Sequence, residues 1–207
     1  MKRTLIWVLV ALLATVIAVL AIVLVPMLTH ESTGSSGQDR PTGFVSEVTA
    51  VGEDARTRYL TAFDENGEPA DLASIKTGDI FTVRGSGYDS NIGIYVGFCK
   101  VPELPDERPS PCLGGIPEDA QTEKTEDISN EALESAWVTN NWAWRTFASH
   151  TFEDAAEGTF EVTLVVPPSE GEGIDCTVDE CGLFTRADHT ALSDRVQDIY
   201  LPIAFAD

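Results

Sequence analysis

The stretch DIYLPIAFA, residues 198–206, alternates apolar with other side chains close to the C-terminus. Successive side chains of an extended chain point to opposite faces, so the apolar members fall on one face of a β-strand: Ile199, Leu201, Ile203 and Phe205. Pro202 falls on the other face and removes a backbone donor, which favours an edge strand or a bulge. The stretch therefore predicts a strand with one face in a hydrophobic core.

Similar short runs precede this strand. In TFEVTLVV, residues 159–166, the apolar side chains again share one face: Phe160, Val162, Leu164 and Val166. Further β-rich runs occupy residues 44–51, 58–63, 79–84, 93–101 and 181–186. Turn-forming residues separate them, as in ENGEP at 65–69 and KTGD at 76–79. Several short strands with such turns predict an all-β sandwich or barrel.

The chain contains four cysteines, Cys99, Cys112, Cys176 and Cys181. An even count in an exported domain favours disulfides, and three pairings exist. We favour the two pairings that close short local loops, Cys99–Cys112 and Cys176–Cys181. The loop-entropy model gives these about 3 and about 2 kcal/mol of stabilisation. A zinc site is the alternative, but the nearby His189 has no second histidine at the usual spacing.

The sequence around the last two cysteines resembles that of a known family. DCTVDEC, residues 175–181, resembles the DCTxxxC signature of neocarzinostatin-like domains, and a short strand-like run, a polar loop and a final apolar run follow it as in that family. Upstream, FTVRGSGY at 81–88 resembles the family's V-x-G-x-G strand and bulge. YVGFC at 95–99, together with Cys112, resembles its first disulfide hairpin. The resemblance covers about residues 59–101 and 158–205.

This resemblance implies a seven-stranded immunoglobulin-like sandwich with locally paired cysteines. In secreted members of the family, a cleft beside the sandwich holds a small aromatic chromophore, so a small apolar or aromatic ligand is the partner that the resemblance implies. The chain departs from the family in three places. It has an apolar N-terminal stretch, a longer Cys99–Cys112 loop and a large insertion at about 102–157.

The insertion is long for a connection within a compact sandwich. Its second half concentrates large aromatic side chains: Trp137, Trp142, Trp144 and Phe147. Such side chains often anchor a protein interface or lie at a membrane interface. They also form satellite cores under long loops, or line a small-ligand cleft. We predict that these four residues contact a partner or a ligand.

An uncharged stretch of 25 residues, 4–28, follows Lys2 and Arg3. As a helix it would reach about 37 Å, enough to cross a hydrocarbon core of about 30 Å. The two cations favour a cytoplasmic N-terminus, which places residues 1–3 in the cytoplasm and the rest of the chain outside. A cleaved signal peptide is the alternative, but its apolar region is normally shorter and ends in small residues of the A-x-A kind.

The residues after this stretch divide into a linker and a domain. Residues 29–43 are small and polar and predict a flexible linker, and residues 44–207 predict the extracytoplasmic domain. Eleven basic and 34 acidic residues follow the apolar stretch, a net charge of −23. Such a surface repels nucleic acid and anionic headgroups, so we expect no nucleic-acid partner. A solvated surface is the simplest interpretation; binding of divalent cations or a basic partner is the other.

No group of residues predicts catalysis. Ser193, His189 and Asp188 contain the side chains of a catalytic triad, but neighbouring residues of a β-chain point to opposite faces and no G-x-S-x-G motif occurs. No P-loop, HExxH motif or EF-hand loop occurs either. His189 with Asp188 or Asp194 is a weak metal-site hypothesis, and loop histidine is the simpler interpretation. We predict no enzyme activity, no metal and no cofactor.

The leading functional prediction is a single-pass, membrane-anchored, non-enzymatic module of the cell envelope. It would be an accessory or stabilising subunit of a larger membrane protein assembly, with the bilayer and a membrane protein as partners. The second is a binding protein for a small apolar or aromatic ligand, as the family resemblance implies. An exported hydrolase is the third.

Overall fold

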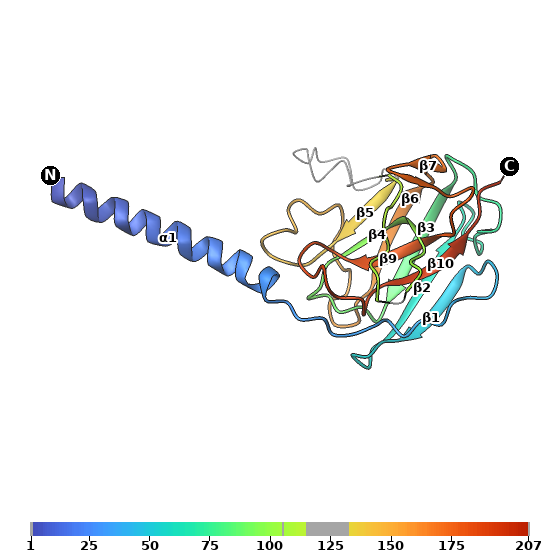
Figure 1. Ribbon diagram of the computed structural model, residues 1–207, viewed down its shortest axis with the longest axis horizontal. Coiled ribbons are helices and arrows are strands. Elements are labelled where there is room, and N and C mark those ends of the chain that lie inside the picture. Colours follow the sequence, from blue (N-terminus) through green and yellow to red (C-terminus); the bar gives the residue numbers. More distant parts are fainter. Residues whose placement is uncertain (1, 105, 115–132, 207) are drawn as a thin grey trace.

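The computed structural model describes residues 2–104, 106–114 and 133–206, which form a long helix followed by a β-sandwich (Figure 1). Helix α1 spans Lys2–Leu28. Its run Arg3–Leu28 is long and apolar enough to cross a membrane, and the helix is not buried against the rest of the chain. The helix is apolar on all sides, which is the pattern of a helix surrounded by lipid rather than by water.

Two four-stranded antiparallel sheets form the sandwich. The sheet that we call the back sheet has the order β1-β2-β3-β6, with the bounds Glu47–Val51, Thr57–Phe63, Ile80–Ser86 and Phe160–Val165. The front sheet has the order β10-β9-β4-β5, with the bounds Ile199–Ile203, Cys181–Ala187, Ile94–Lys100 and Ser135–Val138. A short hairpin adds β7 and β8, which span Glu170–Gly171 and Ile174–Asp175.

The strand order is that of an immunoglobulin-like sandwich. Taken along the chain, β2, β3, β4, β5, β6, β9 and β10 occupy the positions of strands A, B, C, C′, E, F and G. Strand β1 is an additional strand, which pairs with the outer edge of β2. The predicted all-β fold, with one apolar helix in front of it, is confirmed.

The core lies between the two sheets and follows the predicted alternation. On β10, Ile199, Leu201 and Ile203 are at most 5% exposed and belong to the main core cluster. Pro202 faces the other way, and β10 is an edge strand of the front sheet, as its missing donor predicts. On β6, Phe160, Val162 and Leu164 enter the same core.

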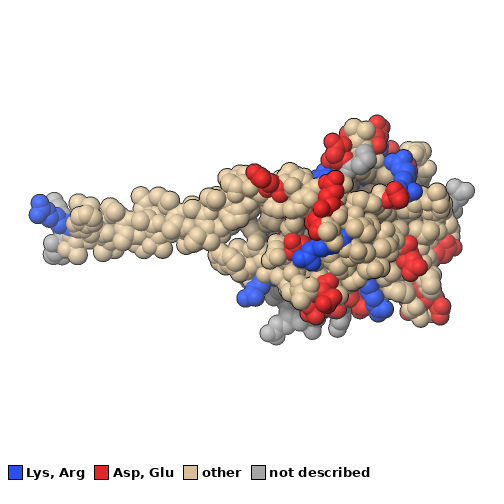
Figure 2. Space-filling view, turned by 90° about the horizontal axis from the view of Figure 1, so that it is seen from below, with Lys and Arg blue, Asp and Glu red and all other residues tan. Residues whose placement is uncertain are grey.

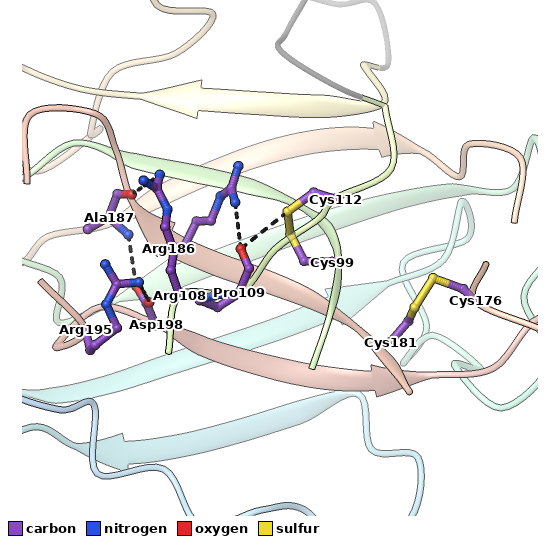
Figure 3. The surroundings of a disulfide bond; sticks show 10 residues. All are labelled: Cys99, Arg108, Pro109, Cys112, Cys176, Cys181, Arg186, Ala187, Arg195 and Asp198. Atoms are coloured by element: carbon purple, nitrogen blue, oxygen red, sulfur yellow. Dashed lines mark hydrogen bonds and ion pairs between the residues drawn. A yellow bond between two sulfur atoms is a disulfide. The ribbon is translucent and has the colours of Figure 1, made fainter. Parts of the chain in front are cut away.

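Both predicted disulfides are present. Cys99 pairs with Cys112 and Cys176 pairs with Cys181 (Figure 3). The first bridge ties β4 to the chain that folds back over the front sheet, and Cys99 and Cys112 form a backbone bridge beside it. The second closes the turn that leads into β9. Zinc is thereby excluded as the role of these four sulfur atoms.

The insertion contains a strand of the sandwich. Residues 135–138 form β5, which extends the front sheet by pairing with β4, so that Trp137 lies opposite Tyr95. Four consecutive buried residues carry no alternation, so sequence periodicity does not reveal this strand. Residues 115–132 of the insertion lie outside the described residues.

The segment after the helix is fastened to the domain, whereas its composition predicts a flexible linker. We call residues 30–38 the strap. At its start, His30 Nε2 lies 2.9 Å from the Asp194 carboxylate, and the backbone N–H and hydroxyl of Thr33 donate to the same oxygen at 3.1 and 2.9 Å. At its end, the Gln38 amide pairs with the backbone of Tyr200 on β10, donating to the carbonyl at 2.7 Å and accepting from the N–H at 2.8 Å. The strap thus covers a sheet edge that would otherwise be open.

Candidate functional site

The outer face of the front sheet is hollowed beside the first disulfide. Gly97 of β4 and Ser135 of β5 lie opposite each other in register, and neither carries a large side chain. A Cβ atom added to Gly97 would lie 3.3 Å from the Ser135 Cβ, so the two strands are tightly apposed at this point. Residues 106–112, which we call the covering segment, return over the sheet to Cys112. The cleft that results measures about 260 Å³.

Polar side chains line one wall of this cleft, and apolar groups line the rest. The lining residues are Tyr95, Val96, Gly97, Cys99, Arg108, Cys112, Ser135, Arg186, His189 and Leu192. The Tyr95 hydroxyl and His189 Nδ1 lie 2.9 Å apart. The Arg186 guanidinium lies 5.7 Å from the centre of the Tyr95 ring. The cleft therefore combines an aromatic floor, a disulfide and two guanidinium groups.

The two arginines are held by backbone carbonyls. Arg186 donates to the carbonyl of Pro109 in the covering segment at 2.6 Å, and Arg108 donates to the carbonyl of Ala187 on β9 at 3.2 Å (Figure 3). These reciprocal bonds fasten the covering segment to the sheet. Neither guanidinium forms an ion pair within 4.0 Å in the part of the chain that the structure describes.

Burial changes the acidity of the groups around the cleft. Burial, followed by repulsion from Arg108, lowers the pKa of Arg186 to about 10. Burial likewise lowers the pKa of Arg108, and repulsion from Arg195 adds to it. Burial, with the nearby Asp188 carboxylate, raises the pKa of Tyr95 to about 12. At neutral pH both guanidiniums are therefore charged and the phenol is neutral.

The predicted aromatic contact residues fall into two groups. Trp137 is only 4% exposed, and its indole N–H donates to the buried Asp188 carboxylate at 2.9 Å. Trp144 packs edge-on against His189, with 4.8 Å between the ring centres. Trp142 and Phe147 are 63% and 53% exposed. Trp137 therefore belongs to the interior, and Trp142 and Phe147 are the residues available to an outside partner.

Two of these tryptophans lie at the end of the domain that faces the helix. Trp142 and Trp144 line a hollow of about 140 Å³ together with the last turns of α1, including Ile22, Val23 and Met27. In Figure 1 the loops that follow β5 and β9 face α1. We call residues 140–148, NNWAWRTFA, the aromatic loop; it contains no acidic residue although the domain is strongly acidic. Figure 2 shows α1 bare of charged side chains between its N-terminal end and the domain.

If the helix crosses a membrane, its length sets the depth at which this loop lies. A helix of 27 residues measures about 40 Å, whereas a hydrocarbon core measures about 30 Å. If Arg3 lies at one boundary of the core, about 20 residues cross it, and Ile22 to Met27 reach the opposite interface. Trp142 and Trp144 would then lie at the headgroup level, where tryptophan is enriched.

The structure does not assemble the residues of the candidate triad. The Asp188 carboxylate accepts hydrogen bonds from Trp137 and from the Thr190 N–H and hydroxyl, and His189 is bonded to Tyr95. Ser193 is exposed. His150, which follows the aromatic loop in the sequence, forms a backbone bridge with Val138, which precedes the loop. Among the described residues, no group of three or more His, Cys, Asp or Glu side chains is placed to hold a metal ion.

Sequence reasoning missed the two cleft arginines and both ends of the strap. Arg186 of β9 lies directly opposite Tyr95 of β4 in the register of the sheet, and no sequence motif marks it. Arg108 reaches the cleft only because Cys112 returns the chain to β4. The disulfide pairing was thus the one sequence signal that could have placed Arg108 near the front sheet.

Comparison with known proteins gives one distant likeness. No family model matches the chain, and no curated protein matches it. Among solved structures, the chain is similar to macromomycin, a protein of the neocarzinostatin family, with 20% sequence identity and a TM-score of 0.35; the match covers 71% of this chain and 99% of that chain.

Proposed function

We propose that this chain is a non-enzymatic, membrane-tethered module that stabilises a larger membrane protein assembly as an accessory subunit. The observation that carries this proposal is the strap. A protein that carries a ligand from one place to another needs a binding domain that can move relative to the membrane anchor. A domain that is fastened to its anchor does not suit that task. Hydrogen bonds between residues 30–38 and the residues Asp194 and Tyr200 instead fasten the strap to the sandwich, so that little free chain separates the sandwich from the helix, which ends at Leu28.

The fastening creates one surface that is continuous from membrane to domain. The bare apolar helix leads into the hollow that Trp142 and Trp144 line, and Trp142 and Phe147 of the aromatic loop are exposed. A neighbouring membrane protein would contact the helix and the aromatic loop at the same time. Aromatic side chains of this kind supply much of the binding energy of protein interfaces.

The proposed absence of catalysis rests on how the polar residues are used. The Asp188 carboxylate is bonded to Trp137 and Thr190, and the nearby histidine to a tyrosine. These bonds hold the β9–β10 connection against β4 and β5, which is a structural role. Export is supported by the two disulfides, which form in oxidising compartments.

The test is extraction of native membranes with a mild detergent, followed by size analysis and mass spectrometry of the fractions that contain the chain. The proposal expects the chain in fractions much larger than 22.4 kDa, together with other membrane proteins. The double variant Trp142→Ser, Phe147→Ser should release it, and the matched back-sheet variant Arg84→Gln should not. Elution of the unaltered protein as a single chain with its detergent would contradict the proposal.

A second candidate function is binding of a small ligand in the cleft of the front sheet. The specific observation in its favour is a hollow of about 260 Å³, close to the lower end of ordinary ligand sites, with an aromatic floor and few convergent polar groups. Uptake of aromatic probes, measured by calorimetry on the full chain, tests it. No heat with any aromatic probe would count against this function and would leave the accessory role untouched.

A further inference from the structure

The cleft of the front sheet is positively charged in a domain that is otherwise strongly acidic. Thirty-four acidic and eleven basic residues follow the apolar stretch, yet two of those basic residues, Arg108 and Arg186, lie at this one cleft. Acidic residues are thus about three times as frequent as basic ones in this part of the chain. Two cations that lie side by side here, near Asp188 and Asp198 but in no ion pair with a described residue, therefore require a physical explanation.

The neighbouring acid does not neutralise them. Asp198 accepts a hydrogen bond from the Arg195 guanidinium at 2.6 Å and another from the Ala187 N–H at 3.0 Å. Its carboxylate is thus committed to a third arginine and to the backbone. Arg195 and Asp198 are both 7% exposed, and Asp198 lines a neighbouring hollow and not this cleft. Figure 3 shows the pair lying apart from the guanidinium of Arg186.

The two cleft arginines have bonding capacity left over. In each, one terminal nitrogen donates to a backbone carbonyl, which carries no full charge. Arg108 Nε is buried and has no hydrogen-bond partner. A partly buried cation with neutral partners is costly, and an anion that accepts two parallel N–H bonds relieves that cost.

We propose that the cleft binds a small aromatic anion, whose carboxylate is held by Arg108 and Arg186 while its ring packs against Tyr95, Leu192 and the Cys99–Cys112 disulfide. This inference rests on the second candidate function, ligand binding, and names the chemical class of the ligand. A volume of about 260 Å³ suits one or two fused rings. The neutral phenol of Tyr95 and the side chain of His189, which lie 2.9 Å apart and both line the cleft, add hydrogen-bond capacity for the same carboxylate.

The test compares three probes that share one shape and differ in charge: 2-naphthoate, 2-naphthamide and 2-naphthylmethylamine. Each is titrated by calorimetry into the full chain in detergent. The proposal expects 2-naphthoate to bind at least tenfold more tightly than the amide, with an affinity that falls as salt rises, and the amine to bind weakest. Arg186→Gln and Arg108→Gln should each remove most of the tenfold difference in affinity between the acid and the amide.

Two controls keep the result interpretable. Arg186→Lys retains a charge and should recover part of the preference, and Arg84→Gln, an exposed arginine of the back sheet, should change nothing. Near-ultraviolet circular dichroism of each variant shows whether the covering segment is still packed. Equal binding of the acid and the amide would overturn the anion proposal and keep ligand binding. No binding of any probe would overturn both.

Discussion

The two sheets of this sandwich share a core but differ on their outer faces. Along β3 and β6 of the back sheet, buried positions alternate with half-buried or exposed ones. Along β4 and β9 of the front sheet, five or more of seven residues are buried, because the covering segment and the insertion pack on the outer face. The back sheet is thus a solvated support, and the front sheet carries the cleft, the strap and the aromatic loop. In this molecule the cleft, the covering segment and the aromatic loop are placed on the front sheet, whereas the additional strand β1 only widens the back sheet.

The largest expected effect is on the free energy of unfolding, and it distinguishes two tyrosines that lie on the outer faces of the two sheets. Tyr200 of the front sheet is 8% exposed and stacks on Phe184 at 4.6 Å, whereas Tyr59 of the back sheet is 49% exposed. Tyr200→Ala should lower the free energy of unfolding by about 3 kcal/mol, because a buried ring is lost. Tyr59→Ala should lower it by less than about 1 kcal/mol. Urea unfolding of both variants checks this, and equal losses would show that the outer face of the front sheet is not a second core.

The two disulfides offer the next comparison. Replacing Cys99 and Cys112 by serine should lower the free energy of unfolding by about 3 kcal/mol and open the cleft, since this bridge returns the chain over the front sheet. Replacing Cys176 and Cys181 should cost about 2 kcal/mol and leave the cleft intact. Denaturation gives the free energies, and binding of 2-naphthoate reports on the cleft. Loss of binding in the second variant alone would contradict this assignment.

A smaller effect is expected from the pH dependence of the front sheet. Burial raises the pKa of Asp198 from 3.8 to about 6, although Arg195 and the Ala187 N–H oppose the change. The folded state therefore holds a proton that the unfolded state has lost, so the stability contributed by this group is complete below about pH 4 and disappears as pH rises through 6. Asp198→Asn should remove this decline. Unfolding curves between pH 4 and 7 that decline equally in both proteins would refute it.

At the strap, the stability is expected to change with pH in the opposite direction, so that it falls as the pH is lowered. Burial alone would raise the pKa of Asp194, but hydrogen bonds from the Val196 N–H, His30 and Thr33 outweigh it and lower the pKa. Its contribution is therefore present above about pH 4 and is lost as pH falls below that value.

The smallest effect on stability is expected in the aromatic loop. Trp142→Phe should change the free energy of unfolding by less than about 0.5 kcal/mol, because the side chain is exposed. In a background that carries Trp7→Phe and Trp144→Phe, so that neither the helix nor Trp144 contributes, it should nevertheless remove most of the quenching of tryptophan fluorescence by brominated lipids. Trp137→Phe is the matched control, since that ring is buried and should contribute little quenching. Unchanged quenching in Trp142→Phe would place the loop away from the bilayer.

The parts of this fold that depend on a local pattern of residues could be predicted from the sequence. The alternation in residues 198–206 predicted an inward face and an edge strand, and the cysteine spacing predicted both bridges. Strand β5 was not predictable, because a strand buried on both faces shows no alternation. The strap was not predictable either. Gln38 pairs with β10 through its side chain, which leaves no periodic signal in the sequence.

The candidate functional residues show the same difference between what a local pattern predicts and what depends on tertiary structure. The large aromatic residues of the insertion were visible from composition, but only the folded chain shows that Trp137 faces inward and Trp142 outward. Arg108 and Arg186 are separated by a strand, an insertion and a hairpin in the sequence. Their meeting depends on the return of the chain at Cys112, which is tertiary information.

The proposal that helix and sandwich are rigidly connected is tested most directly by pulsed electron paramagnetic resonance in lipid nanodiscs. Spin labels at Leu28→Cys on the helix and Glu65→Cys on the far β2–β3 turn report the distance across the strap. A narrow distance distribution is predicted for this labelled protein, and a broad one once Gln38→Ala and Asp194→Asn are added. A broad distribution with the strap intact would contradict the account, because the sandwich would then move freely on its anchor.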